Sequence, residues 1–150
     1  ITLGICAALP LITERYELCR YDRLSFALVA GLAIYAAVTG NGLQAVCAGY
    51  LAFGCLWLGS CLTKEPLCAA YVKYGYGRDA LQNPIFMRTN YILAAAWGVV
   101  YIVIAIVSYF LSGKVPALVL SIAVQAIPIL MGLFTALFQN WYPARVAAGK

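Results

Sequence analysis

Four long apolar runs, separated by polar segments, constrain the fold of this chain more than any other feature. They cover residues 24–39, 43–62, 91–111 and 115–138. A helix that crosses a membrane needs about 20 mostly apolar residues. The first run is the shortest, and the neutral turn at 40–42 completes it at the interface. We therefore expect an all-α, polytopic transmembrane helical bundle of four spans, arranged as two hairpins within a single membrane domain, 1–150.

The composition excludes soluble and disordered proteins. Hydrophobic residues make up 65% of the chain, charged residues 10%, and the mean hydropathy is +0.90. A soluble domain carries about 25% charged residues, so this chain has too few to cover a surface exposed to water. Disorder requires low hydrophobicity and high charge. The chain is therefore expected to be an integral membrane protein.

Two turns define the hairpins. Asn41-Gly42 is a turn signal between the first two runs. Ser112-Gly113-Lys114 separates the last two runs, and Pro116 suits the first turn of the following helix. Residues 1–12 are apolar but extend only about 18 Å as a helix. They are expected to form a re-entrant or interfacial piece, or the end of a fifth span.

The basic residues predict how the chain is threaded. Apart from Lys114, every Lys and Arg lies in segment 13–23, in segment 63–90 or after residue 138. Four spans place these three segments on one side of the membrane. Because basic residues accumulate on the cytoplasmic side, segment 63–90 and the C-terminus are expected to be cytoplasmic.

The connection at 63–90 holds most of the polar signals. Glu65 and Pro66 suit the start of a short amphipathic helix that lies in the headgroup zone, and Gly75-Tyr76-Gly77 ends it. Asn83-Pro84 is typical of a helix N-cap and first turn. The third span is therefore expected to begin near Pro84, before the membrane.

The candidate partner or lipid contacts of this connection are Lys64, Arg78, Arg88 and Asn90. On one interpretation, the basic side chains contact lipid phosphates and tyrosines form an interfacial belt. On the other, Arg78, Arg88 and Asn90 together bind an anionic ligand or dock a partner.

Gln44 and Gln125 are the candidate intramembrane polar site. Pro128 is expected to kink the last helix, and Gln125 beside it either lines a small pore or hydrogen-bonds a neighbouring helix. No Asp, Glu, Lys, Arg or His lies within an apolar run, which argues against an ion-coupled transporter.

Small residues recur four positions apart in three of the runs. The pairs are Ala27 and Gly31, Ala36 and Gly40, Ala45 and Gly49, and Ala94 and Gly98. Such spacing lets helices approach closely in a membrane. It predicts tight packing within the bundle or against another protein.

The sequence gives little support for catalytic or cofactor chemistry. The chain has no histidine, which excludes His-ligated haem, His-bearing metal sites and His-based triads. The six cysteines lack the C-x-x-C spacing of a redox enzyme, so free thiols are expected. We predict a non-enzymatic protein with no cofactor, no metal site and no nucleic-acid partner.

A stretch from residue 24 to residue 97 resembles a known family. Lys64, Pro66 and Leu67 end one span, and the P-x-x-x-R-x-N element of Pro84, Arg88 and Asn90 opens the next. In these features the chain is similar to the bacterial intracellular septation protein A family. The resemblance implies a polytopic protein of the bacterial inner membrane, linked to the cell envelope or to division, with no catalytic residues to carry over.

These features lead to two functional expectations. The first is a non-enzymatic protein that acts through protein or lipid contacts, in the cell envelope or as an accessory or structural subunit of a larger membrane complex. Its partners would be membrane lipids and other membrane subunits or further copies of itself. The alternative is a small channel or transporter with a pathway near Gln125 and Pro128.

Overall fold

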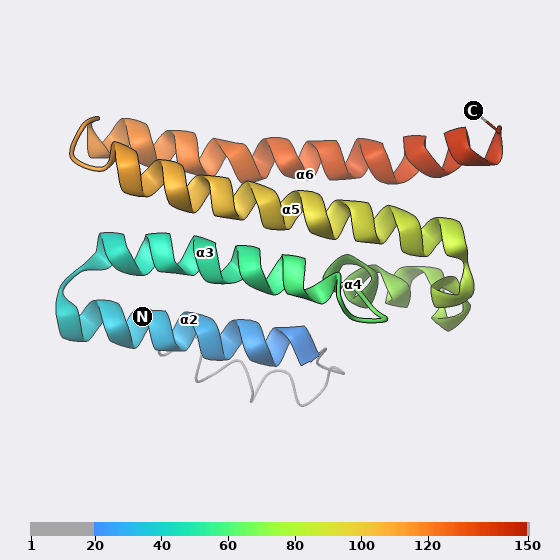
Figure 1. Ribbon diagram of the computed structural model, residues 1–150, viewed down its shortest axis with the longest axis horizontal. Coiled ribbons are helices and arrows are strands. Elements are labelled where there is room, and N and C mark those ends of the chain that lie inside the picture. Colours follow the sequence, from blue (N-terminus) through green and yellow to red (C-terminus); the bar gives the residue numbers. More distant parts are fainter. Residues whose placement is uncertain (1–19, 150) are drawn as a thin grey trace.

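The computed structural model describes residues 20–149, and this part of the chain folds as an all-α helical bundle (Figure 1). In chain order the elements are α2 (Arg20–Thr39), α3 (Gly42–Ser60), α4 (Leu67–Tyr76), the 3-10 helix η1 (Arg78–Gln82), α5 (Pro84–Leu111) and α6 (Ala117–Ala147). Helices α2, α3, α5 and α6 are long and apolar enough to cross a membrane. The predicted four-span membrane fold is confirmed, and residues 1–12 lie outside the described part.

Both hairpins turn where the sequence predicts. Gly40 has a φ of +66° and Gly113 a φ of +74°, backbone conformations that glycine adopts without steric cost. The Asn41 side chain caps α3 by accepting a hydrogen bond from the backbone N–H of Gln44, at 3.1 Å. These turns make α2 antiparallel to α3, and α5 antiparallel to α6 (Figure 1).

The connection between the hairpins also follows its predicted signals. Helix α4 begins after Pro66 and ends at Gly77, whose φ is +85°. Asn83 caps α5 by accepting from the backbone N–H groups of Ile85 and Phe86, at 2.9 and 3.2 Å, and Pro84 occupies the first turn. The end of α6 differs from the prediction, since the helix continues to Ala147 rather than ending near Phe138. Hydropathy marks where the apolar run stops, and a helix continues into water as long as its backbone hydrogen bonds persist.

The four spans differ in length. Helices α2 and α3 have 20 and 19 residues, whereas α5 and α6 have 28 and 31. At about 1.5 Å per residue, the first pair matches the roughly 30 Å hydrocarbon core of a bilayer. The second pair is longer by about three turns. The extra turns of α5 and α6 extend past the end of α3, and α4 lies in the space beside them (Figure 1).

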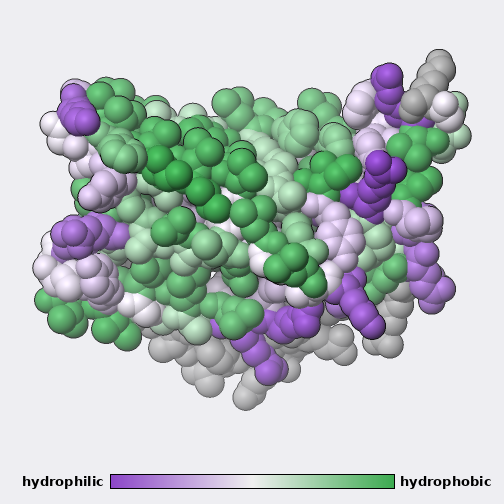
Figure 2. All heavy atoms as spheres, in the orientation of Figure 1, coloured by the Kyte–Doolittle hydropathy of each residue, from purple (hydrophilic) through white to green (hydrophobic). Residues whose placement is uncertain are grey.

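We call this end of the bundle, formed by the start of α2, residues 61–90 and the last turns of α6, the polar end. The turns at 40–42 and 112–116 form the opposite end. On the face that Figure 2 shows, hydrophobic residues cover most of the surface between the two ends, and hydrophilic residues gather toward each end. The surface thus has the band that a spanning protein presents to lipid.

The closest packing in the bundle is between α3 and α5, at two glycines. A Cβ added to Gly54 would lie 2.6 Å from Ile102 Cγ1 and 3.0 Å from the carbonyl oxygen of Gly98. A Cβ added to Gly98 would lie 2.6 Å from Leu58 Cγ and 3.0 Å from its backbone nitrogen. The absence of two side chains therefore lets the two backbones approach directly.

The predicted small-residue contacts are confirmed only in part. Gly98 is in the tight α3–α5 contact, and Gly49 faces Leu32 of α2, with 3.3 Å between that side chain and an added Cβ. Gly31 and Gly40 have no atom within 4 Å of an added Cβ in the described part of the chain. Gly54 was not predicted, because no small residue precedes it by four positions.

We predict that Gly54→Ala and Gly98→Ala each lower the free energy of unfolding by about 1–3 kcal/mol, the usual cost of overpacking a core. Unfolding in mixed detergent–SDS micelles, followed by circular dichroism, measures the change. Gly59→Ala is the matched control on α3, since nothing lies within 4 Å of its Cβ position. It should leave stability unchanged or raise it by up to about 1 kcal/mol. Equal losses in all three variants would contradict the glycine contact.

Candidate functional site

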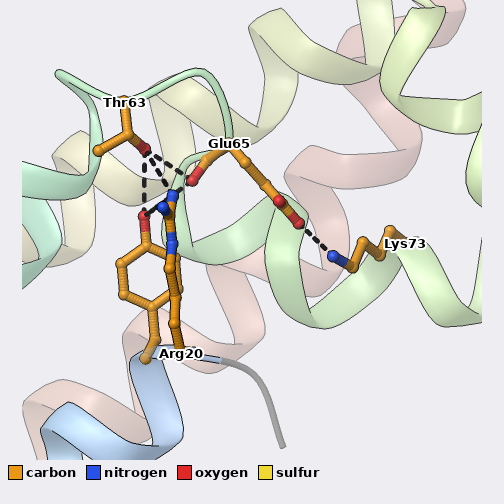
Figure 3. Close-up of polar contacts among 5 residues, drawn as sticks. Arg20, Thr63, Glu65 and Lys73 are labelled. Atoms are coloured by element: carbon orange, nitrogen blue, oxygen red, sulfur yellow. Dashed lines mark hydrogen bonds and ion pairs between the residues drawn. The ribbon is translucent and has the colours of Figure 1, made fainter. Parts of the chain in front are cut away.

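Tyrosine hydroxyls hold the polar end together. The buried Tyr21 of α2 donates to the backbone carbonyl of Glu65, at 2.8 Å, and lies 3.1 Å from the Thr63 hydroxyl. Tyr91 of α5 donates to the backbone carbonyl of Thr63, at 2.6 Å. Two carbonyls of the turn after α3 thereby gain partners from two different helices. The Thr63 hydroxyl also donates to the Glu65 carbonyl across this turn, at 2.8 Å, and Figure 3 shows the two groups facing each other.

Further contacts attach α4 to the same network. The Ser60 hydroxyl donates to the carbonyl of Trp57 at 2.6 Å and accepts from the backbone N–H of Leu67 at 3.0 Å, which joins the end of α3 to the start of α4. Glu65 pairs with Lys73, with 2.5 Å between Oε1 and Nζ (Figure 3). Tyr71 donates to the Asp22 carboxylate at 2.5 Å. The acidic groups named here therefore contribute to the fold.

The predicted contact residues that can be placed lie in different surroundings. Lys64 and Arg88 are exposed, whereas Asn90 is only 5% exposed. Successive residues of a helix are about 100° apart, so positions 88 and 90 lie about 200° apart, on nearly opposite faces of α5. The side chain of Arg78 lies outside what the structure describes. Helix α5 therefore does not place Arg88 and Asn90 on one face, and a joint site that includes Arg78 stays a prediction.

Asn90 instead lines a cavity at the polar end, between α4, α5 and α6. We call this the polar-end cavity, and its volume is about 440 Å³. Its apolar wall includes Val72, Phe86 and Leu93, and its polar wall includes Asn90, Gln139 and Asn140. No Lys, Arg, Asp or Glu is among the described residues that line it. This arrangement suits an uncharged ligand with both an apolar and a hydrogen-bonding part.

The two glutamines predicted as an intramembrane polar site lie in different places. Gln44 is near the turn of the first hairpin and accepts a hydrogen bond from the Tyr35 hydroxyl, at 2.8 Å. Gln125 lines a mostly apolar groove of about 510 Å³ along α2 and α3, whose lining residues include neither Gln44 nor Pro128. A channel pathway near Gln125 and Pro128 stays a prediction.

Sequence reasoning missed the polar contact that joins α5 to α6. Trp97 Nε1 donates to the Thr135 hydroxyl at 2.9 Å. The Trp97 ring also packs against Trp57 and Tyr101, with centroids 5.6 and 5.5 Å apart. A tryptophan in an apolar run signals that its N–H needs an acceptor. That signal could have paired Trp97 with one of the few hydroxyls in the last span.

The cysteines that the structure describes are free thiols: Cys47, Cys55, Cys61 and Cys68. Cys6 and Cys19 lie outside the described residues. Between residues 20 and 149 no three His, Cys, Asp or Glu side chains gather as metal ligands. Burial raises the pKa of the Cys68 thiol, on α4, to about 12, and the nearby Cys61 adds to this shift. Cys68 is therefore a poor nucleophile at neutral pH.

We predict that Tyr21→Phe and Tyr91→Phe loosen the polar end. Tyr91→Phe leaves the Thr63 carbonyl without its donor, and Tyr21→Phe removes one of the two donors of the Glu65 carbonyl. The cost of each is about 1–3 kcal/mol. Trypsin should then cleave after Lys64 and Lys73 faster than in the unmodified protein, as peptide mass spectrometry would show. Tyr109→Phe is the matched control, because Tyr109 is 64% exposed at the other end of α5. Unchanged cleavage in both test variants would contradict the network.

We also predict slow alkylation of Cys68. With a pKa of about 12 rather than 9.0, its thiolate fraction at pH 8 is about a thousandfold lower than that of an unshifted thiol. Iodoacetamide should label it slowly at pH 8 and faster as the pH rises toward 12. The same peptide from protein unfolded in SDS provides the reference rate. Equal rates in folded and unfolded protein would contradict the raised pKa.

Comparisons of the chain with protein-family models, curated proteins and solved structures found no match. The resemblance to the septation protein A family therefore stays an expectation from the sequence. The case for a function rests on the geometry of the helices and of the polar end.

Proposed function

We propose that this protein is a non-enzymatic subunit of a larger membrane assembly, which it joins through the outer faces of α2 and α6. The observation that carries the proposal is the open row of helices: α2 lies beside α3, α3 beside α5, and α5 beside α6 (Figure 1). No residue in the apolar stretch of α2 is buried. The buried share of the apolar stretch is 11% in α6 and 33% in α5. Each outer helix thus has a large face without a neighbour in the described part of the chain.

Small residues on these outer faces favour a helical partner over lipid alone. Gly31 on α2 and Gly132 on α6 are exposed, and no atom lies within 4 Å of an added Cβ at either position. Glycines of this kind let a second helix approach closely. A close approach of this kind occurs within the chain, between α3 and α5, at Gly54 and Gly98. Lipid chains gain no comparable contact from a missing side chain.

The charge distribution supports a cytoplasmic polar end. Six basic residues belong to the polar end: Arg20, Arg23, Lys64, Lys73, Arg88 and, near the C-terminus, Arg145. Lys114 lies at the opposite end. By the positive-inside rule, the C-terminus would then be cytoplasmic. The resemblance drawn from the sequence supplies the bacterial inner membrane and the cell envelope as the setting.

The polar end supports a structural rather than a catalytic role. Its acidic side chains Asp22 and Glu65 bond Tyr71 and Lys73, and its tyrosines satisfy backbone carbonyls. These groups hold the connection between the hairpins in place. Membrane lipids would contact the rest of the apolar surface of the bundle.

We predict that Gly31→Leu and Gly132→Leu reduce the mass of the complex in which the chain is extracted by a mild detergent, because a bulky side chain blocks a close helix contact. Native mass spectrometry gives the protein mass and composition. Gly59→Leu is the matched control, an exposed glycine of α3 with equally open surroundings, and it should leave the complex intact. All three variants should unfold at the same SDS fraction as the unmodified protein.

Two results would contradict the proposal. One is a monomer that carries only lipid and detergent when extracted from its native membrane. The other is a stoichiometric complex that neither Gly31→Leu nor Gly132→Leu reduces.

A further inference from the structure

The register of α5 and α6 places the polar-end cavity at the boundary of the membrane. The Trp97–Thr135 hydrogen bond aligns the two antiparallel helices at one level. One turn further toward the polar end lie Leu93 on α5 and Gln139 on α6, and Asn90 comes next; all three line the cavity. The apolar run of α5 begins at residue 91. The amides of the cavity therefore lie where the hydrocarbon ends and headgroups begin.

Two of these amides have a fixed orientation. Asn90 Nδ2 donates to the carbonyl of Phe86 at 2.8 Å, and Asn140 Nδ2 donates to the carbonyl of Ala136 at 2.9 Å. A backbone carbonyl can only accept, so the amide nitrogen must be the atom that faces it. The oxygen of each side chain is then the atom left available to a ligand. Asn90 is 5% exposed, and its oxygen has no hydrogen-bond partner within residues 20–149.

Other groups of the cavity add acceptors and a few donors. The Thr89 hydroxyl gives its proton to the carbonyl of Ile85, at 2.8 Å, and keeps its lone pairs. Gln139 makes no hydrogen bond within the part of the chain described, so both atoms of its amide are available. Asn83 uses its oxygen for the helix cap and retains its NH₂. A hydroxyl group, which donates one hydrogen bond and accepts others, matches this mixture.

The rest of the lining argues against a charged ligand. The described residues around the cavity provide no opposite charge, and Arg88 is exposed on the far face of α5. A charge moved from water into such a site would lose hydration without a partner. The apolar side instead offers Val72, Leu93 and the paired rings of Tyr76 and Phe86, whose centroids are 5.6 Å apart. Aromatic and aliphatic walls suit the carbon face of a sugar or a glycerol backbone.

From these observations we infer that the polar-end cavity binds the uncharged, hydroxyl-bearing headgroup of a membrane lipid. The hydroxyls bond Asn90, Gln139 and Asn140, and the glycerol and first acyl carbons lie against Leu93 and Phe86. A volume of about 440 Å³ is within the usual range for small-molecule sites, about 300–1,000 Å³. This ligand site goes beyond the proposed role as an assembly subunit and does not depend on it.

The test is lipid binding by native mass spectrometry, on the full chain in phosphatidylcholine nanodiscs. Three separate dopants are compared at equal amounts: monoglucosyl-diacylglycerol, diacylglycerol and phosphatidylglycerol. We expect a retained adduct of one of the two uncharged lipids, at several times the occupancy of the anionic phosphatidylglycerol. Retention of the glucosyl lipid alone assigns the headgroup to a sugar, and retention of diacylglycerol assigns it to glycerol. Equal retention of all three, or preference for phosphatidylglycerol, overturns the inference.

Variants locate the site. Gln139→Leu removes an amide that has no role in folding contacts, and Asn90→Leu removes the buried acceptor; each should lower occupancy about fivefold or more. Ala147→Trp fills the cavity from the helix end and should lower it without touching an amide. Gln82→Leu is the matched control, an exposed glutamine of η1 outside the lining, and it should bind as the unmodified chain does.

The variants also keep this inference separate from the assembly proposal. Lipid occupancy is read as mass added to each protein species, whereas assembly is read from the protein mass itself. Equal occupancy in Gln139→Leu, Asn90→Leu and Ala147→Trp would overturn the site even where a complex is present.

Discussion

The direct approach of α3 and α5 at Gly54 and Gly98 is the contact on which the other helices depend. Within a bilayer, lipid chains are as apolar as leucine, so helices associate through close packing and a few polar bonds. The two glycines bring backbone against backbone, since a Cβ added to Gly54 would lie only 3.0 Å from the Gly98 carbonyl oxygen. Helix α2 then packs on α3, while α6 and α4 pack on α5. Separation of the central pair would leave each outer helix with one neighbour that has itself lost its support.

At the polar end, side chains provide hydrogen-bond partners for backbone groups that lie outside the helices. The chain leaves α3 at Ser60, makes a tight turn and starts α4 at Leu67, which leaves backbone groups without helical partners. Tyr21 and Tyr91, from distant parts of the chain, and Ser60, at the end of α3, supply these partners. Because these partners come from α2, α3 and α5, the turn connects three helices at the level of the headgroups. The polar-end cavity gains its walls from the elements that this turn positions.

Local signals in the sequence predicted much of the fold. The hydropathy runs located the four spans, and the Asn83-Pro84 pair located the start of α5, because a cap and its first turn are adjacent in the chain. Gly54 could not be recognised in this way. Its role depends on which face of α5 lies opposite, and that is decided by contacts between residues far apart in sequence.

The candidate site was predicted less well. Arg88 and Asn90 are close in the chain, which suggests a shared site, but the period of the helix places them on nearly opposite faces. Asn90 was singled out as a polar residue at the start of a span, and it lines the polar-end cavity. Its companions Gln139 and Asn140 were missed, since the apolar run ended at residue 138 and the continuation of α6 carries no hydropathy signal. A cavity formed by three elements becomes visible only when their register is known.

The unequal lengths of the two hairpins have a consequence for how the molecule sits in its membrane. The α2–α3 hairpin is as long as a typical hydrocarbon core is thick, so a vertical shift would move either its turn or the network around Tyr21 into hydrocarbon. The helices of the α5–α6 hairpin are about three turns longer than those of the α2–α3 hairpin, so the longer hairpin tolerates such a shift. The shorter hairpin therefore sets the immersion depth of the whole chain. Helices adapt to a thicker bilayer by tilting less or by thinning the lipid around them. In such a bilayer, the hydrophobic mismatch would affect the shorter hairpin first.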